Sequence, residues 1–321
     1  MATHDNEPMT LALHALPRTE TPPQGVSRLD EWGVIRATGP DAAAFLHGQL
    51  TNDIEHLETG VARLAGYCSA KGRLLASFVV WRPAPDEVLL ACSADLLPAT
   101  LKRLSMFVLR AKCRLSDASG DFALYGLAGA PAAATGLRPG ESRSDAGRHT
   151  IRLADVDGVA RAMLAQPAGD APPAYPPLEA GSWQWLEAAS GVPRIVAATS
   201  EQFVPQMVNL ELVGGVNFQK GCYPGQEVVA RSQYRGTLKR RAFLFTLPVP
   251  ARPGQELFDA ADPGQPAGMV VNAASWRGST LVLAEVKLAA VGQEPLRLGS
   301  ADGPALDPVA LPYEVPMEAN A

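Results

Sequence analysis

Short apolar runs alternate with polar positions along most of the chain, and from Leu29 they interleave with a few helical patterns. Two of the strand-like runs are joined by the proline-rich segment 82–86, which is typical of a hairpin. We predict strands at 32–36, 74–81, 87–92, 111–116, 121–127, 151–155 and 158–164.

Three segments carry a helical pattern. Asp41 can cap a helix that has Phe45, Leu46 and Leu50 on one face. A second helix begins near Pro98, with its buried stripe running from Leu97 to Val108. Ser182 can cap a short helix that ends at Gly191. Strands and helices interleave without regular β-α-β spacing, so we predict an α+β fold with antiparallel sheets.

The proline content and the change in pattern divide the chain. Residues 1–25 are polar and indicate a loose leader, and five prolines in 166–181 exclude regular helix there. Beyond about residue 239 only short apolar runs remain, between Gly, Pro and Asp. We therefore expect a leader at 1–25, a main α+β region at 26–238 and a carboxy-terminal β-barrel at 239–321.

Composition narrows the class of protein. The chain has 321 residues, 47% of them hydrophobic, with a net charge of −5. This length favours two or three packed units, and no apolar run approaches the roughly 20 residues that span a bilayer. The amino terminus lacks the basic and apolar regions of a secretion signal, so we expect a cytoplasmic protein that does not act on membranes. The acidic balance does not support broad nucleic-acid binding.

The four cysteines exclude most metal and disulfide architectures. None forms a C-x-x-C pair, and none of the five histidines forms a ligand-like pair, so we predict no zinc site, cluster cradle or disulfide framework. Cys68, Cys92 and Cys113 lie in strand-like apolar surroundings and are interpreted as small buried hydrophobes.

Cys222 differs from the other three. Gly221 and Gly225 flank it closely and indicate a tight loop, and Lys220 can favour its thiolate. Such a thiol could be a nucleophile, a redox centre or a metal ligand. The alternative and simpler interpretation is a structural cysteine beside a lysine that points to solvent. Glu227 falls in the first turn of a helix that can follow the loop.

The string K-G-C-Y-P-G-Q-E-V-V-A-R at 220–231 closely resembles the signature of the YgfZ family, which is related in fold to the aminomethyltransferase (T-protein) of glycine cleavage. The resemblance extends from about residue 26 to the end of the chain. Supporting stretches are L-D-E-W at 29–32, G-Q-L-T-N-D at 48–53, C-S-A-K-G-R at 68–73, G-V-P at 191–193 and L-P-Y at 311–313.

The resemblance implies three subdomains in a ring around a channel that binds tetrahydrofolate or another folate. It implies a bacterial cytoplasmic protein that assists assembly or repair of iron–sulfur clusters, with transient contacts to iron–sulfur proteins and an indirect role in methylthiolation of tRNA. The functional loop carried over is Lys220, Gly221, Cys222, Tyr223, Gly225, Gln226 and Glu227. Trp32 and Trp183 match folate-contact positions, and we assign Arg231 to the same ligand. Core packing is the alternative for Trp183 and Trp185.

Two departures bear on the alternative of a tetrahydrofolate-dependent aminomethyltransferase. The catalytic aspartate of the T-protein would fall at 75–77, which reads Leu-Ala-Ser and holds no carboxylate. The pterin-binding glutamate falls opposite Ala189, with Glu187 displaced by two residues. We therefore do not expect a free-standing enzyme.

A basic run follows the cysteine motif. It can be a solvated surface at a domain junction, or a positive channel wall that attracts the folate tail. Direct binding of tRNA is a third interpretation, which the net acidic charge disfavours. The run consists of Arg231, Arg235, Lys239, Arg240 and Arg241.

Overall fold

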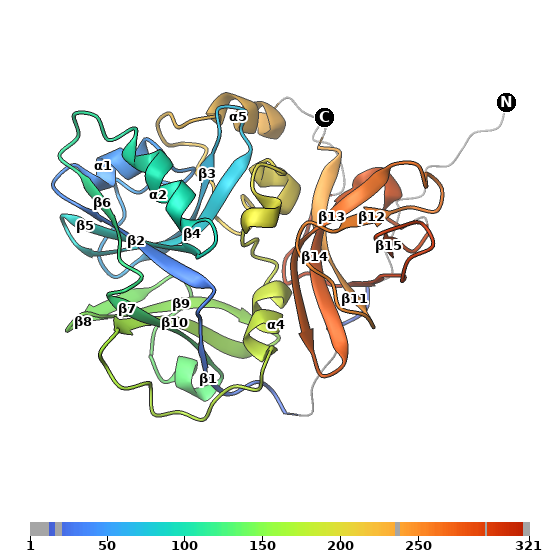
Figure 1. The fold of residues 1–321 in the computed structure, drawn as a ribbon, viewed down its shortest axis with the longest axis horizontal. Helices are drawn as coiled ribbons and strands as arrows, with labels where there is room; N and C mark the ends of the chain where they lie inside the picture. Colours follow the sequence, from blue (N-terminus) through green and yellow to red (C-terminus); the bar gives the residue numbers. More distant parts are fainter. Residues whose placement is uncertain (1–12, 17–20, 235–237, 293, 317–321) are drawn as a thin grey trace.

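Three antiparallel sheets make up the protein (Figure 1). The computed structural model describes residues 13–16, 21–234, 238–292 and 294–316. Much of the expected leader, 1–12 and 17–20, therefore lies outside the described residues. Its last residue does not belong to a leader, because Gly25 begins strand β1. The predicted α+β class with antiparallel sheets is confirmed.

The strands of the first sheet are buried along continuous runs, and the cross-strand partners Ile35 and Leu90 are fully buried. Helices α1 (Ala42–His47) and α2 (Leu97–Ser105) contact its strands. Asp41 precedes α1 but does not cap it, because its carboxylate accepts a hydrogen bond from the Lys112 backbone at 2.7 Å. The strand order is β3 (Ala62–Cys68), β4 (Leu74–Ala84), β5 (Glu87–Ser93), β2 (Trp32–Thr38) and β6 (Arg114–Asp117).

The hairpin between β4 and β5 is tighter than predicted. Ala84 pairs with Glu87, so only residues 85 and 86 form the turn, and a register shift between Trp81 and Ala84 accommodates Pro83 within β4. Proline is tolerated at such an irregularity because it has no backbone N–H for the ladder.

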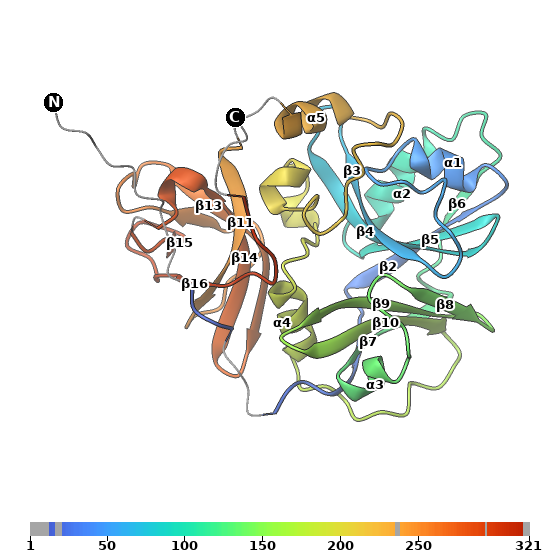
Figure 2. The same ribbon diagram turned by 180° about the vertical axis from the view of Figure 1, so that it is seen from behind.

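The second sheet lies beside the first and carries the short helix α3 (Ala130–Ala133) (Figure 2). Its strand order is β1 (Gly25–Arg28), β7 (Phe122–Ala128), β10 (Val159–Pro167), β9 (Arg148–Val156) and β8 (Ser142–Asp145).

Helix α4 (Ser182–Ala189) follows the proline-rich loop and lies between the second sheet and the third (Figure 2). Ser182 is the first residue of this helix and not its cap. Gly181 takes the capping position with a φ of 81°, and the Ser182 hydroxyl donates to the Glu179 carbonyl at 2.7 Å.

The third sheet curls into a half-barrel over its own apolar core, which includes Leu257, Val270 and Val282. This agrees with the barrel-like class expected for the carboxy-terminal part. The strand order is β15 (Arg297–Leu298), β12 (Glu256–Phe258), β13 (Pro266–Trp276), β14 (Ser279–Lys287), β11 (Arg240–Leu247) and β16 (Asp307–Val309), with a 3-10 turn η3 at Leu288–Ala290.

Residues 190–234 connect the second sheet to the third and pack against the first, with short turns η1 (Ala197–Thr199) and η2 (Pro205–Val208) and helix α5 (Gln226–Tyr234). Arg241 on β11 forms a buried ion pair with Glu211 of this connection. Asn209 donates to the Ala242 carbonyl at 2.8 Å, and the Tyr313 hydroxyl donates to the Gly191 carbonyl at 2.7 Å. These contacts hold the third sheet beside the other two. Across the described ranges, no helix is long and apolar enough to cross a membrane.

Candidate functional site

A cavity of about 490 Å³ lies where the three sheets meet. The first sheet contributes Trp32 and Phe78 and the second contributes Met163. The third sheet contributes Asn272, and the segment near the carboxy terminus contributes Tyr313. The size and the mainly apolar wall with a few polar groups are typical of a small-molecule site.

Trp32, Glu187 and Arg194 form the polar centre of the cavity wall. The Trp32 indole Nε1 donates to Glu187 Oε1 at 3.1 Å, and the Arg194 guanidinium lies 5.1 Å from the Trp32 ring centroid. Arg194 Nη2 is 3.8 Å from Glu187 Oε2. One aromatic face, one carboxylate and one guanidinium therefore converge on the same space.

Burial perturbs the charged groups of this centre. Desolvation raises the pKa of Glu187, against the opposing effect of Arg194. Arg161 also lines the cavity and is buried, and desolvation lowers its pKa to about 10 although Glu187 acts to raise it. A cavity-facing carboxylate with a perturbed pKa is typical of a ligand or catalytic site.

Trp183 and Arg231, unlike Trp32, do not line the cavity. Trp183 is 1% exposed, and its ring packs so closely on β7 that a Cβ added at Gly126 would lie 2.3 Å from it. Arg231 lies on α5 with an exposed side chain, paired with Glu227 at 2.9 Å. The structure therefore brings Trp32 together with Glu187 and Arg194, places Trp183 in the core against which Trp32 packs, and separates Arg231 from them. Trp185 is also buried, with its ring centroid 5.9 Å from that of Trp276.

The stretch 75–77, where the catalytic aspartate of the T-protein would fall, ends in a hydrogen-bonded serine. Ser77 lines the cavity, and its Oγ accepts from the Ile195 backbone at 2.9 Å. Ala189, the position aligned with the pterin-binding glutamate of the T-protein, is fully buried. Glu187, two residues before it, faces the cavity and is the residue that could take that role. Arg194 was not predicted from the sequence, although this residue directly follows the G-V-P stretch at 191–193.

Cys222 is the exposed thiol among the four cysteines. Burial raises the pKa of Cys68 and of Cys92 to about 12. Cys113 is half-buried, less than predicted, and desolvation raises its pKa to about 11. A thiolate is the reactive form of cysteine, so those three thiols are poorly suited to chemistry near neutral pH.

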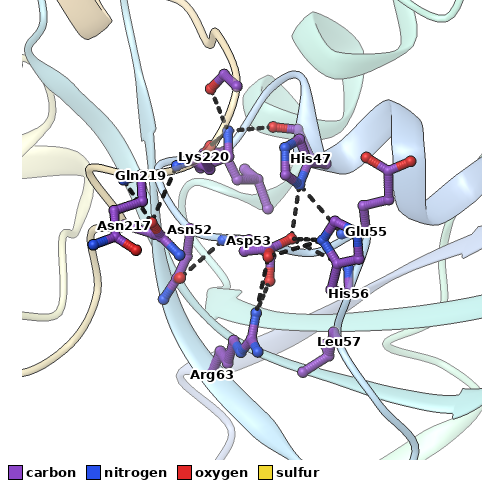
Figure 3. A network of polar contacts seen from close by, with 12 residues as sticks. His47, Asn52, Asp53, Glu55, His56, Leu57, Arg63, Asn217, Gln219 and Lys220 are labelled. Carbon is purple, nitrogen blue, oxygen red and sulfur yellow. Dashed lines mark hydrogen bonds and ion pairs between the residues drawn. The ribbon is translucent and has the colours of Figure 1, made fainter.

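Lys220 does not point to solvent, which corrects the simpler interpretation of this residue. Its Nζ donates to the carbonyl oxygens of His47 at 2.5 Å, Leu50 at 3.0 Å and Gly221 at 3.3 Å (Figure 3). The first two belong to the carboxy-terminal end of α1 and the turn after it, where a cation is favourable. Desolvation lowers the pKa of Lys220 to about 8, while Asp53 and Cys222 act to raise it.

The other motif residues shape the loop. Tyr223 is buried, and Lys220 Nζ lies 4.7 Å from its ring centroid. Gly225 has a φ of 77°, and a Cβ there would lie 2.3 Å from the Ser69 carbonyl oxygen. Gln226 Nε2 is 3.5 Å from the Gly221 carbonyl, and Glu227 occupies the first turn of α5 as predicted.

Arg63 connects the cavity with the surroundings of Lys220. Its side chain lines the cavity, and its guanidinium donates to the Asp53 carbonyl and lies 3.9 Å from the Asp53 carboxylate (Figure 3). Asp53 in turn contacts the His47 ring, and the His47 carbonyl accepts a hydrogen bond from Lys220 Nζ.

The basic run does not form a positive wall in the part that the structure describes. Arg231 pairs with Glu227, Arg240 with Glu285 at 2.7 Å, and Arg241 with Glu211. Lys239 is exposed. Arg235, the remaining member, lies outside the described residues.

Known proteins resemble this chain in sequence and in fold. The model of the GCVT N-terminal domain family matches residues 25–161. The tRNA-modifying protein YgfZ of Edwardsiella ictaluri is 35% identical over 237 residues, covering 69% of this chain and 70% of the relative. The protein of the same name from Klebsiella pneumoniae is 32% identical, covering 68% and 70%. The crystal structure of glycine cleavage system aminomethyltransferase T from Bartonella henselae superposes with a TM-score of 0.72, covering 93% of this chain and 88% of that one, at 18% identity. At that identity the last match shows the fold alone.

Proposed function

The chain belongs to the YgfZ family, and from this premise we propose that it is a folate-binding accessory protein for the assembly or repair of iron–sulfur clusters. Its support of tRNA modification would be indirect, through enzymes that carry such clusters. Cys222 would act as an exposed reactive thiol, and the site of action would be the cytoplasm.

The cavity-facing group of Trp32, Glu187 and Arg194 carries the proposal for folate. A pterin is flat and has hydrogen-bond donors along one edge, which suit the Trp32 ring and the Glu187 carboxylate. Arg194 can hold the carboxylate in place and present its guanidinium to an acceptor on the ring. When bound, tetrahydrofolate supplies a reduced ring that carries one-carbon units. Trp183 would support this site from the core, and Arg231 would not belong to it.

Calorimetric titration with tetrahydrofolate tests the ligand and its place together. Trp32→Ala and Glu187→Gln should each weaken binding about tenfold or more, corresponding to about 1.4 kcal/mol. Arg231→Ala is the matched control, since its exposed side chain lies on α5, and it should bind as the wild type does. Equal affinity in all four proteins would contradict the proposed site.

The role of the thiol is tested in cells that lack the wild-type protein. Cys222→Ser keeps the size of the side chain and removes its thiolate chemistry, so the activity of iron–sulfur enzymes should fall while folding is unchanged. Cys113→Ser is the control, because that half-buried thiol is held in its neutral form. Full enzyme activity with the serine form at 222 would exclude a role for the thiol.

The fold favours one second candidate, a tetrahydrofolate-dependent aminomethyltransferase. Ser77 argues against it, because a hydrogen-bonded hydroxyl cannot replace a carboxylate as proton acceptor. Purified protein incubated with an aminomethyl-loaded carrier and tetrahydrofolate should yield no methylene-tetrahydrofolate. Formation of that product would reverse the order of the two candidates.

A further inference from the structure

His47 and Asp53 form a hydrogen-bonded pair beside the loop that carries Cys222. His47 Nδ1 lies 2.9 Å from Asp53 Oδ1, and both side chains are more than four-fifths buried (Figure 3). A carboxylate only accepts hydrogen bonds, so this contact requires the proton on Nδ1. The Glu55 backbone N–H, at 3.4 Å from the same nitrogen, is the weaker contact. The tautomer leaves a lone pair on Nε2.

The free nitrogen of His47 faces the cysteine loop. An ideal Cβ built at Gly221 would lie 3.6 Å from His47 Nε2. Gly221 directly precedes Cys222, and consecutive Cα atoms are about 3.8 Å apart. Nε2 of His47 therefore lies beside the backbone that leads into Cys222.

Hydrogen bonds fix both the backbone and the ring of His47 beside this loop. Lys220 Nζ donates to the His47 carbonyl, and the Asp53 carboxylate accepts from the His47 ring. A base oriented by a carboxylate on its far nitrogen is the arrangement that activates nucleophiles in unrelated enzymes.

We propose that His47 is the proton acceptor for Cys222 and that Asp53 is its positioning residue. The proton passes from Sγ to Nε2, directly or through one water, which leaves a thiolate and an imidazolium. Asp53 keeps the Nδ1 proton and stabilises the imidazolium. This inference rests on the proposed function only in taking Cys222 as the reactive thiol.

Several titratable or charged groups surround His47. They are Asp53, His56, Arg63, Lys220 and Cys222. Partial burial acts to raise the pKa of Asp53, but hydrogen bonds from His56 and His47 outweigh it and lower that pKa. Asp53 therefore stays ionised throughout the range in which a thiol and an imidazole exchange a proton.

The pH profile of Cys222 alkylation tests this. The full-length protein is treated with iodoacetamide between pH 5.5 and 10, and mass spectrometry of the Cys222 peptide gives the rate. His47→Gln should raise the midpoint by about one pH unit, so that alkylation at pH 6.5 is about tenfold slower. Rates at pH 10 should be equal, because the thiolate then forms without a base. Asp53→Asn should give a smaller shift in the same direction.

His14→Gln is the matched control. His14 is exposed, and its backbone pairs with Val309 of β16 in the third sheet. Its profile should superimpose on that of the wild type. Superimposable profiles for wild type and His47→Gln would overturn the proposal. So would alkylation that His47→Gln slows equally at every pH, because that result indicates a displaced loop and not a lost base. Because the assay contains neither folate nor clusters, a failure of folate binding or of the cellular test leaves its result unaffected.

Discussion

The buried glutamates of this protein have two kinds of surroundings. Glu285 and Glu211 are buried beside Arg240 and Arg241, and these pairs join parts of the chain. Glu187 instead has Arg194 only at 3.8 Å and faces the cavity, so it keeps acceptor capacity for a ligand. The distinction separates structural carboxylates from the one that fits a binding role.

His149 should make stability depend on pH. Its ring is buried near Trp81 and Phe122, and desolvation lowers its pKa to about 4. The unfolded chain binds this proton from about pH 6.5, while the folded protein resists it until about pH 4. The free energy of unfolding therefore falls as pH drops through this interval.

His149→Gln should reduce that loss. The quantity to compare is the difference in unfolding free energy between pH 7 and pH 4.5, measured by urea denaturation. His14→Gln, at an exposed position, should keep the wild-type difference. An unchanged difference in His149→Gln would show that other groups control the acid transition.

At the scale of elements, strands with strong apolar periodicity could be predicted from the sequence, and strands with weak periodicity could not. The strands near Trp32, Leu74 and Glu87 lie where the sequence predicts them. Strand β3 was missed, because Ala-Arg-Leu-Ala-Gly-Tyr-Cys contains few strong strand formers and a glycine. Strand β1 was missed because four residues beside prolines resemble a leader and gain their order by pairing with β7 and with the segment 176–178.

The site was predictable only where its residues are close in sequence. The Lys220–Cys222 loop is one continuous motif. His47 lies 173 residues from Lys220, and Glu187 lies 155 from Trp32, so no spacing rule relates them. The packing of helices and loops against the sheets brings such residues together.

The cysteine loop depends on a close contact with the turn between β3 and β4. At Gly225 an added Cβ would meet the Ser69 carbonyl, and the backbone is left-handed. Gly225→Ala should therefore lower the unfolding free energy by about 1–3 kcal/mol and expose the loop to protease. Gly169→Ala is the control, since nothing lies within 4 Å of its Cβ position. Equal stability of the two variants would contradict this account.

At the scale of the whole molecule, the buried pair of Arg241 and Glu211 joins the third sheet to the rest. Arg241→Met leaves Glu211 buried without its partner and should cost about 3–5 kcal/mol. Adding Glu211→Leu should recover part of that loss, because neither charge then remains.

The exposed pair of Arg277 and Glu179 provides the control, and Arg277→Met should leave the unfolding free energy nearly unchanged. Denaturant unfolding curves give all of these values. If the variant carrying both Arg241→Met and Glu211→Leu lost as much as the two substitutions lose separately, Arg241 and Glu211 would not act as a unit.

The cavity draws its wall from all three sheets, so whatever fills it holds them together. A ligand present at a hundred times its dissociation constant adds about 2.7 kcal/mol to the folded state. If the ligand is the folate proposed above, it would act as a clamp between the sheets, and the folded protein would resist proteases better when the ligand is present.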